Sequence, residues 1–176
     1  MWHSRHGITW PGLSKSIDVM NRLQRHRGPD GEGIWVHRAG WVAFGHVRLS
    51  IIDLSTGGQP MQGRDGNWIS FNGEIYNYIE LRKELGEKSF QTTSDTEVIL
   101  RSYEKWGEYC IHKLRGMFAF AIWDERNRSL FCARDRFGIK PLYFSLLTRI
   151  NRKFEYRNPK SENIVPLLSA ISLIRD

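Results

Sequence analysis

This 176-residue sequence contains little cysteine and no long apolar segment. Its two cysteines, Cys110 and Cys132, do not suggest a disulfide framework, and no charged-then-apolar signal segment precedes the first predicted helix. The longest apolar run, Met117 to Trp123, is far shorter than the roughly 20 residues that a membrane-spanning helix needs. We therefore expect a soluble, cytoplasmic protein without a membrane partner.

The formal net charge of +7 raises the question of a nucleic-acid partner. Residues 145–176 hold six Lys or Arg and three Asp or Glu, so +3 of this charge belongs to the C-terminal segment. The one basic cluster, Arg22 to Arg27, is typical of the exposed face and C-terminal end of a helix. Because it lacks the interleaved aromatic side chains of single-strand binders, we expect no nucleic-acid partner.

Helical and strand patterns occur in groups along the chain, which suits one domain at this length. Apolar spacing and β-rich runs predict helices around 17–23, 79–85 and 96–106 and strands around 33–36, 41–53, 67–71, 117–124, 129–135 and 141–145. Strands in hairpins, with helices gathered between them, indicate an α+β domain built on antiparallel sheet.

Some short stretches carry chemically informative residues, and each also has a purely structural interpretation. Arg48, in GHVRLSII, could be an ordinary arginine at a strand end. Asn72-Gly73, in FNGEIYN, is typical of a type I′ hairpin turn. Ser94 to Glu97, in TSDTEV, has the pattern of a capping box before a helix. Arg134-Asp135-Arg136 could bind an anion, but an internal ion pair is the favoured interpretation.

The order of the motifs favours a functional interpretation. The motifs are, from the N-terminal end, RHRGPDGEGIW, GHVRLSIIDLSTGGQPM, NGEIYNY, ELR, TSDTEVIL, RGMFAFAIWD and ARDRFGIKPLY. Together they resemble the glutaminase domain of glutamine-dependent asparagine synthetases, which are class II glutamine amidotransferases. The resemblance covers about Gly7 to Phe144 and implies an Ntn-hydrolase-like four-layer αββα sandwich of mostly antiparallel sheets. It divides the chain into an aberrant N-terminus (1–6), a glutamine amidotransferase domain (7–144) and a divergent tail (145–176).

The resemblance also implies a site for L-glutamine, a zwitterion with a carboxamide tail. Arg48 would bind the carboxylate through its two-pronged guanidinium, and Asp95 would bind the ammonium group. The side-chain amide of Asn72 and the backbone N–H of Gly73 would form the oxyanion hole. The pocket walls would come from Leu49, Ser50, Ile51, Ile52 and Glu74.

The family's nucleophile is not found at the start of this sequence. Members begin Met-Cys-Gly-Ile-Ala-Gly-Ile, and after removal of Met the cysteine attacks with its own α-amine as base. Here Met1 is followed by Trp2. One codon series for the family start, when translated two bases downstream with GTG as the initiator, encodes Met-Trp-His-Ser-Arg-His. This is the sequence of residues 1–6. We therefore expect an off-frame N-terminus, and the tail at 145–176 is interpreted as off-frame or truncated.

The nucleotide-binding loop of the synthetase half, SGGxDS, has no equivalent, because STGGQP lacks its Asp-Ser pair. We therefore expect no cofactor in this domain, whereas ATP and Mg would belong to an absent synthetase domain or subunit. The leading hypothesis is a glutaminase-domain fragment that binds glutamine without hydrolysing it, and the alternative is a non-catalytic glutamine-binding or regulatory module. A third interpretation makes Met1-Trp2-His3 a Cu(II) or Ni(II) site.

Overall fold

The computed structural model describes residues 12–49, 58–150, 153–156 and 167–172, and beyond residue 144 it describes the backbone only. The helical elements are α1 (Leu13–Gln24), η1 (Arg25–Arg27), α2 (Tyr78–Leu85), η2 (Glu87–Ser89), α3 (Asp95–Trp106) and η3 (Gly107–His112). The strands are β1 (Gly31–Val36), β2 (Ala43–Arg48), β3 (Met61–Gln62), β4 (Trp68–Ile75), β5 (Gly116–Asp124), β6 (Ser129–Arg134), β7 (Tyr143–Ile150), β8 (Lys153–Tyr156) and β9 (Leu167–Ser172).

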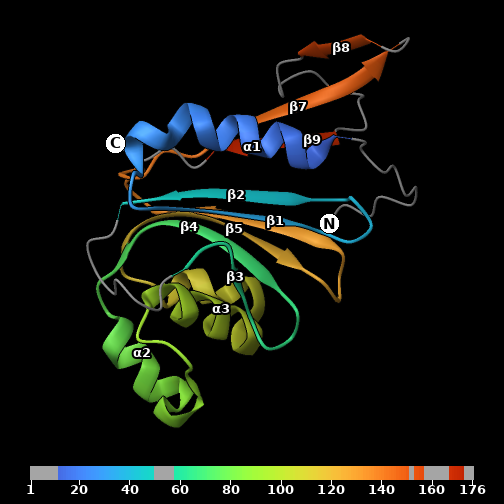
Figure 1. The fold of residues 1–176 in the computed structure, drawn as a ribbon. Helices are drawn as coiled ribbons and strands as arrows, with labels where there is room; N and C mark the ends of the chain where they lie inside the picture. Colours follow the sequence, from blue (N-terminus) through green and yellow to red (C-terminus); the bar gives the residue numbers. More distant parts are fainter. Residues whose placement is uncertain (1–11, 50–57, 151–152, 157–166, 173–176) are drawn as a thin grey trace.

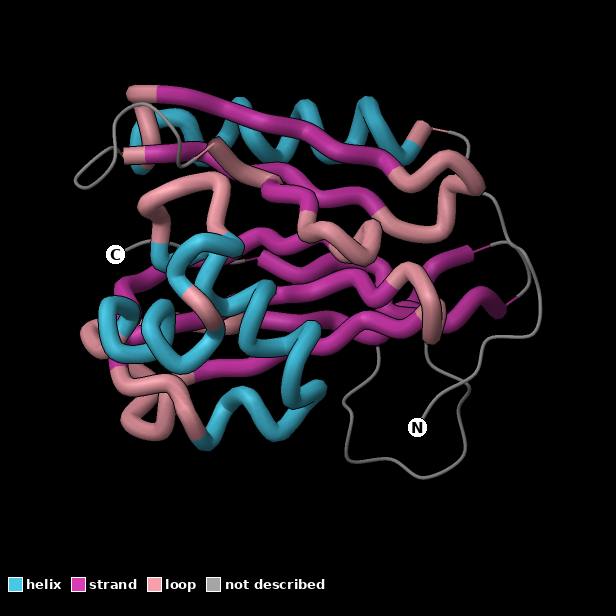
Figure 2. Tube along the Cα trace, turned by 90° about the horizontal axis from the view of Figure 1, so that it is seen from below, coloured by secondary structure: helices cyan, strands magenta, loops and turns pink. Residues whose placement is uncertain are grey.

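The described strands form three antiparallel sheets, and two of them stack between helices. β1 pairs with β2, a second sheet has the order β3-β4-β5-β6, and a third has the order β8-β7-β9. Figure 1 shows α1 on one side of the β1-β2 hairpin, the β3–β6 sheet on its other side, and α2 and α3 beyond that sheet; Figure 2 shows the same stack from below. The order helix, sheet, sheet, helix confirms the predicted α+β sandwich.

One apolar core lies between the β3–β6 sheet and α3. Alternate residues of β4, such as Ile69, Phe71 and Ile75, belong to this core, because successive side chains of a strand point to opposite faces. From α3 they meet Val98, Ile99 and Leu100, which are fully buried, as the apolar periodicity of this helix predicts.

The other face of the same sheet packs against the β1-β2 hairpin. Phe44 of β2 joins Ala121 and Trp123 of β5 in a second apolar cluster. The rings of Trp35 and Trp68, from β1 and β4, stack with their centroids 4.7 Å apart at an interplanar angle of 15°. These aromatic contacts hold the two sheets face to face.

The structural interpretations of the Asn72-Gly73 and Ser94–Glu97 motifs hold only in part. Asn72 and Gly73 form no hairpin turn, because both lie inside the continuous strand β4, which extends to Ile75. Ser94 caps α3 as predicted, with its Oγ accepting the N–H of Thr96 at 3.1 Å. However, the Glu97 carboxylate does not complete a capping box: it accepts the N–H groups of Gln91 and Thr92, and so fixes the preceding loop. Sequence spacing cannot distinguish these two uses of Glu97.

The predicted ion pair around Asp135 is also wrong. Its carboxylate accepts the backbone N–H groups of Phe118, Phe137, Ile139 and Lys140. Arg134 donates to the backbone carbonyls of Lys140 and Gly138 instead of to Asp135. The two side chains therefore close the turn after β6 through backbone groups.

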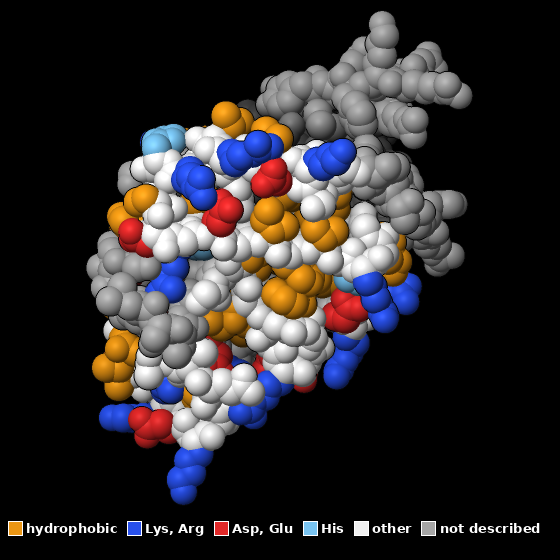
Figure 3. Space-filling view, in the orientation of Figure 1, with side chains coloured by type: hydrophobic (Ala, Val, Ile, Leu, Met, Phe, Trp, Pro, Cys, Tyr) orange, Lys and Arg blue, Asp and Glu red, His pale blue; other side chains and the backbone are white. Residues whose placement is uncertain are grey.

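The second predicted strand is shorter than expected in the described part of the chain. β2 ends at Arg48, and positions 50–53 of the prediction lie outside the described residues. The basic cluster lies as predicted at the exposed end of α1, where Arg22 pairs with Asp18 and Arg25 approaches Glu32. On the face shown in Figure 3, Lys and Arg side chains are interspersed with Asp and Glu. Among the described residues, no helix is long and apolar enough to cross a membrane.

Candidate functional site

Arg48 lies at the C-terminal end of β2, where the loop that precedes β1 contacts its backbone. The N–H of Asp30 donates to the carbonyl of Arg48 at 3.0 Å. Gly28 packs so closely on this strand end that a Cβ there would come within 2.6 Å of the Arg48 nitrogen. The close packing explains the glycine and holds the strand end in place.

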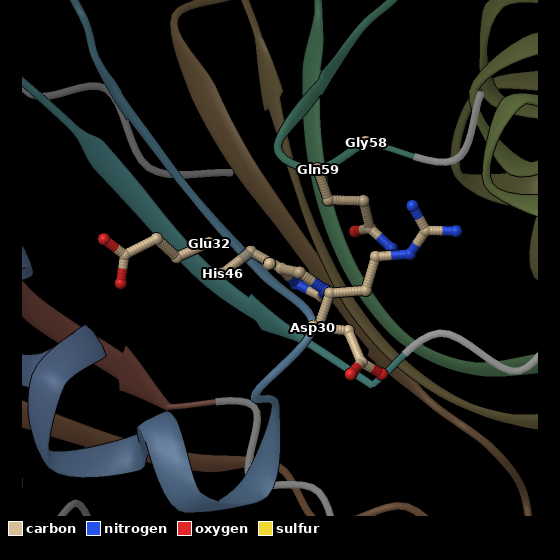
Figure 4. Close-up of a pocket in the computed structure, with 7 residues that line it drawn as sticks. Asp30, Glu32, His46, Gly58 and Gln59 are labelled. Atoms are coloured by element: carbon tan, nitrogen blue, oxygen red, sulfur yellow. The ribbon is translucent and has the colours of Figure 1, made fainter. Parts of the chain in front are cut away.

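A pocket of about 140 Å³ surrounds this strand end. It is well below the roughly 300–1,000 Å³ of sites for drug-sized ligands, so its volume suits a molecule the size of an amino acid. Figure 4 shows its lining, in which the Glu32 carboxylate points away from the other labelled side chains. The lining residues are Asp30, Gly31, Glu32, His46, Arg48, Gly58 and Gln59.

Two contacts between the sheets determine how β2 aligns with β4. Trp35, the β1 partner of Phe44, stacks on Trp68, and Nδ1 of His46 lies 3.4 Å from Oγ of Ser70. Arg48 follows His46 by two residues in β2, and Asn72 follows Ser70 by two residues in β4, so each lies on the same face of its strand as the earlier residue. Both therefore lie at the same end of the sandwich, with the Asn72 side chain on the face of β4 toward β2 and only 7% exposed.

The edge of β4 beside this end has an ordered set of backbone partners. The amide of Gln59 accepts the N–H of Phe71 at 2.6 Å, and Oδ2 of Asp95 accepts the N–H of Ile75 at 3.0 Å. In an antiparallel ladder alternate residues direct their N–H groups to the same edge. The N–H of Gly73 is therefore directed to the edge between Gln59 and Asp95.

Gly73 has a steric requirement that comes from the neighbouring strand β5. Its φ is +144°, and a Cβ would lie 2.0 Å from the carbonyl oxygen of Met117 and 2.7 Å from Cα of Phe118. Both atoms belong to β5, whose Phe118 is the register partner of Gly73. Glycine at this position is thus required by the neighbouring strand, independently of any ligand.

Asp95 is the first residue of α3, directly after the Ser94 cap. Burial raises the pKa of its carboxyl and the nearby Glu74 adds to this, while N–H donation from Ile75 and Thr96 acts in the opposite direction. A cationic group beside this carboxylate would relieve the cost of its ionisation. Asp95 is therefore suited to bind an ammonium ion.

Arg48 ends β2 at the end of the sandwich where Asn72 and Gly73 lie in β4, and Asp95, the first residue of α3, is bonded to the end of β4 through the N–H of Ile75. Glu74 follows Gly73 in β4, and Leu49 follows β2 with 40% of its surface exposed. Ser50, Ile51 and Ile52 lie outside the described residues, as does the candidate metal site at Met1-Trp2-His3. Within the described ranges, no group of three or more His, Cys, Asp or Glu residues is placed to hold a metal ion.

Sequence reasoning missed Gln59, His46 and Asp30 as pocket residues. Gln59 lies in GHVRLSIIDLSTGGQPM, one of the motifs that carry the family resemblance, but the resemblance assigns no role to its side chain. Nothing in its composition indicates that a glutamine side chain would pair with a strand backbone.

The chain belongs to the glutamine amidotransferase domain family. The family model described as "Glutamine amidotransferase domain" matches residues 7–156. Among solved structures, glutamine phosphoribosylpyrophosphate amidotransferase from B. subtilis, complexed with ADP and GMP, has the same fold. The TM-score is 0.58 at 24% identity, over 81% of this chain and 38% of that chain.

Curated proteins similar to this chain include glutamine-hydrolysing asparagine synthetases. Asparagine synthetase 1 of Bacillus subtilis is 53% identical over 134 residues, which cover 74% of this chain and 21% of the relative. Asparagine synthetase 2 of Oryza sativa subsp. japonica is 46% identical over 131 residues, covering 74% of this chain and 22% of the relative. The chain thus spans about a fifth of the length of these relatives.

Proposed function

We propose that this domain binds free L-glutamine at the joined ends of β2, β4 and α3. The observation that supports the proposal is the arrangement of three complementary groups in one region. These are the Arg48 guanidinium beside the pocket, the amide and N–H donors of Asn72 and Gly73, and the Asp95 carboxylate.

Each group matches one end of a glutamine molecule. The planar guanidinium of Arg48 can donate two parallel hydrogen bonds to the α-carboxylate. Asp95 supplies the negative charge for the α-ammonium group, at a carboxyl whose ionisation is costly without a cation. Asn72 and Gly73 supply donors for the oxygen of the carboxamide, and in catalytic relatives they would stabilise the oxyanion.

We propose further that the chain does not hydrolyse the glutamine it binds. Acyl transfer of this type needs a thiolate next to a base. The two cysteines of the sequence are Cys110 and Cys132, and burial raises the pKa of each thiol to about 12. Thiols with such raised pKa values are poorly suited to act as this nucleophile.

The names of the relatives suggest the wider reaction. They are asparagine synthetases that hydrolyse glutamine, and this chain spans only about a fifth of their length. We propose that ammonia from such a site serves the ATP-dependent amidation of aspartate or a related carboxylate, in a synthetase domain or subunit outside this sequence. ATP and Mg would be bound there and not by this domain.

Isothermal titration calorimetry with L-glutamine tests the proposal. The protein should bind glutamine, and Arg48→Ala should weaken the affinity about ten- to hundredfold, because a hydrogen bond to a charged group contributes about 1.5–3 kcal/mol. Arg22→Ala, which removes an exposed guanidinium on α1, is the matched control and should bind like the unmodified protein. Absence of binding, or equal losses in both variants, would disprove the assignment.

A further inference from the structure

The side chain of Gln59 takes a place in the β-sheet that a strand backbone would otherwise occupy. β3 pairs Met61 with Ile69 and Gln62 with Trp68, and the same antiparallel register continued by two residues would put residue 59 opposite Phe71. The backbone of residue 59 does not make this pair. Instead Oε1 accepts the N–H of Phe71 at 2.6 Å, and Nε2 donates to the Phe71 carbonyl at 3.0 Å. The carboxamide thus satisfies both polar groups of Phe71, as a neighbouring strand would.

Gln59 also contacts α3 and the β1-β2 hairpin, the other elements around the candidate site. Its Nε2 lies 3.4 Å from Oγ1 of Thr96, the residue after Asp95. On the opposite side its backbone carbonyl lies against β1, where a Cβ on Gly33 would come within 2.1 Å of the oxygen. The same residue lines the pocket next to Arg48. One side chain therefore contacts β4, α3 and the pocket, and its backbone contacts the hairpin.

These contacts indicate how Gln59 acts. A glutamine amide has two N–H hydrogens, and here they are directed to the Phe71 carbonyl and the Thr96 hydroxyl. Gln59 is therefore engaged with the protein and does not serve as a donor to a ligand. Its anchor at Phe71 lies one residue before Asn72 and two before Gly73, the two residues that supply the donors of the proposed site.

We infer that Gln59 is a positioning residue, which holds Asn72 and Gly73 in register for the carboxamide of a bound glutamine. The inference rests on the proposed glutamine site and adds a residue that sets its selectivity. Loss of the Gln59 amide would free the Phe71 segment of β4 and displace the two donors. Recognition of the carboxamide would then suffer, whereas recognition of the amino-acid head group by Arg48 and Asp95 would persist.

The test compares L-glutamine with L-norvaline, which has the same head group and chain length but no carboxamide. Calorimetry on the full chain gives both affinities and their ratio. In Gln59→Met, which is nearly isosteric, the glutamine affinity should fall about tenfold or more while the norvaline affinity changes less than about twofold, since displaced donors affect only the carboxamide. A role confined to stability would not change this ratio.

Asn77 offers a matched control. Its amide makes the same two-point contact with a backbone, donating to the carbonyl of Lys113 at 3.0 Å and accepting the N–H of Arg115 at 2.9 Å. Asn77→Leu should lower the unfolding temperature much as Gln59→Met does, yet leave the ratio unchanged. If Gln59→Met unfolds below the assay temperature, Gln59→Glu is measured instead. Glutamine and norvaline have the same head group, so the added charge affects both affinities alike and cancels in their ratio.

The outcomes separate this inference from the proposed function. An unchanged ratio in the Gln59 variant, with glutamine still bound by the unmodified protein, overturns the positioning role and leaves the glutamine site intact. A ratio that falls equally in the Asn77 variant also overturns it. Failure of the unmodified protein to bind glutamine overturns both.

Discussion

The backbone N–H of Ile75 donates to Oδ2 of Asp95 across 3.0 Å, joining the end of β4 to the first turn of α3. The bond fixes one carboxylate oxygen of Asp95. Because an amide oxygen can accept the same bond, Asp95→Asn removes the charge without removing this link.

Asp95→Asn should therefore fold normally and bind glutamine about tenfold or more weakly, since the ammonium group loses its counter-charge. Calorimetry with glutamine gives the affinity, and circular dichroism checks the fold. Glu97→Gln, in the same helix, is the charge-matched control: it leaves the ammonium partner unchanged. Equal affinities for the Asp95 variant and the unmodified protein would contradict the role of Asp95.

The raised pKa of Asp95 predicts how glutamine affinity depends on pH. Burial and the nearby Glu74 favour the neutral carboxyl, while a bound ammonium group favours the ionised one. Affinity should stay constant well above the raised pKa and fall by up to about tenfold per pH unit below it, because binding then releases one proton. Titrations at several pH values measure this. A profile in Asp95→Asn with the same slope would show that another group is responsible.

Restoring the family start tests the chemistry of the rest of the site. Residues 1–6 are replaced by Met-Cys-Gly-Ile-Ala, and ammonia release is measured. In that background Asn72→Ala should mainly lower turnover, by about 10²–10³-fold, because the oxyanion exists only along the reaction path. Arg48→Ala should mainly raise KM, because it removes a contact made in both the ground and transition states. The reverse pattern would show that the two roles are wrongly assigned.

Gly73→Ala should destabilise the domain strongly. A Cβ there would lie 2.0 Å from the Met117 carbonyl oxygen, and because that atom is backbone, β4 and β5 would have to separate locally. We expect a loss of about 2–4 kcal/mol in unfolding free energy, measured by denaturant titration. Gly31→Ala is the control, since its nearest neighbour would be 3.9 Å away, and it should change stability by less than about 0.5 kcal/mol.

The lowered pKa of Asp135 predicts that the free energy of unfolding decreases at acid pH. Its burial alone would raise the pKa, but the N–H groups of Lys140, Ile139, Phe118 and Phe137 together lower it below the ordinary 3.8. Because the pKa is lower in the folded state than in the unfolded state, the ionised carboxylate stabilises the fold at pH values above the unfolded-state pKa. This stabilisation is lost as the pH falls through the folded-state pKa. Asp135→Asn should cost about 2 kcal/mol at neutral pH and weaken the acid dependence. Denaturant titrations between acid and neutral pH compare the two proteins.

The sequence predicts the elements of this fold better than their local connections. The apolar spacing of α3 and the β-rich apolar runs of β4 and β5 can be recognised in the sequence, because burial of these elements requires such patterns. The strand contact that excludes a side chain at Gly73 could not be predicted, because it comes from Met117 on a strand more than forty residues away in the chain. Likewise, the pairing of Gln59 with Phe71 depends on where β3 ends, which no local pattern states. Arg48, Asn72 and Asp95 were identified through the resemblance, since nothing in their spacing predicts that three separate segments meet.

The stacked rings of Trp35 and Trp68 give this sandwich a spectroscopic reporter of its own. Two indoles at 4.7 Å and 15° lie close enough for their electronic transitions to couple, so their contribution to ultraviolet circular dichroism depends on this stacking. Since one ring belongs to the β1-β2 hairpin and the other to β4, the signal exists only while the two sheets remain together. Its loss during denaturation, timed against the helical signal, would reveal whether the hairpin detaches before the helices melt.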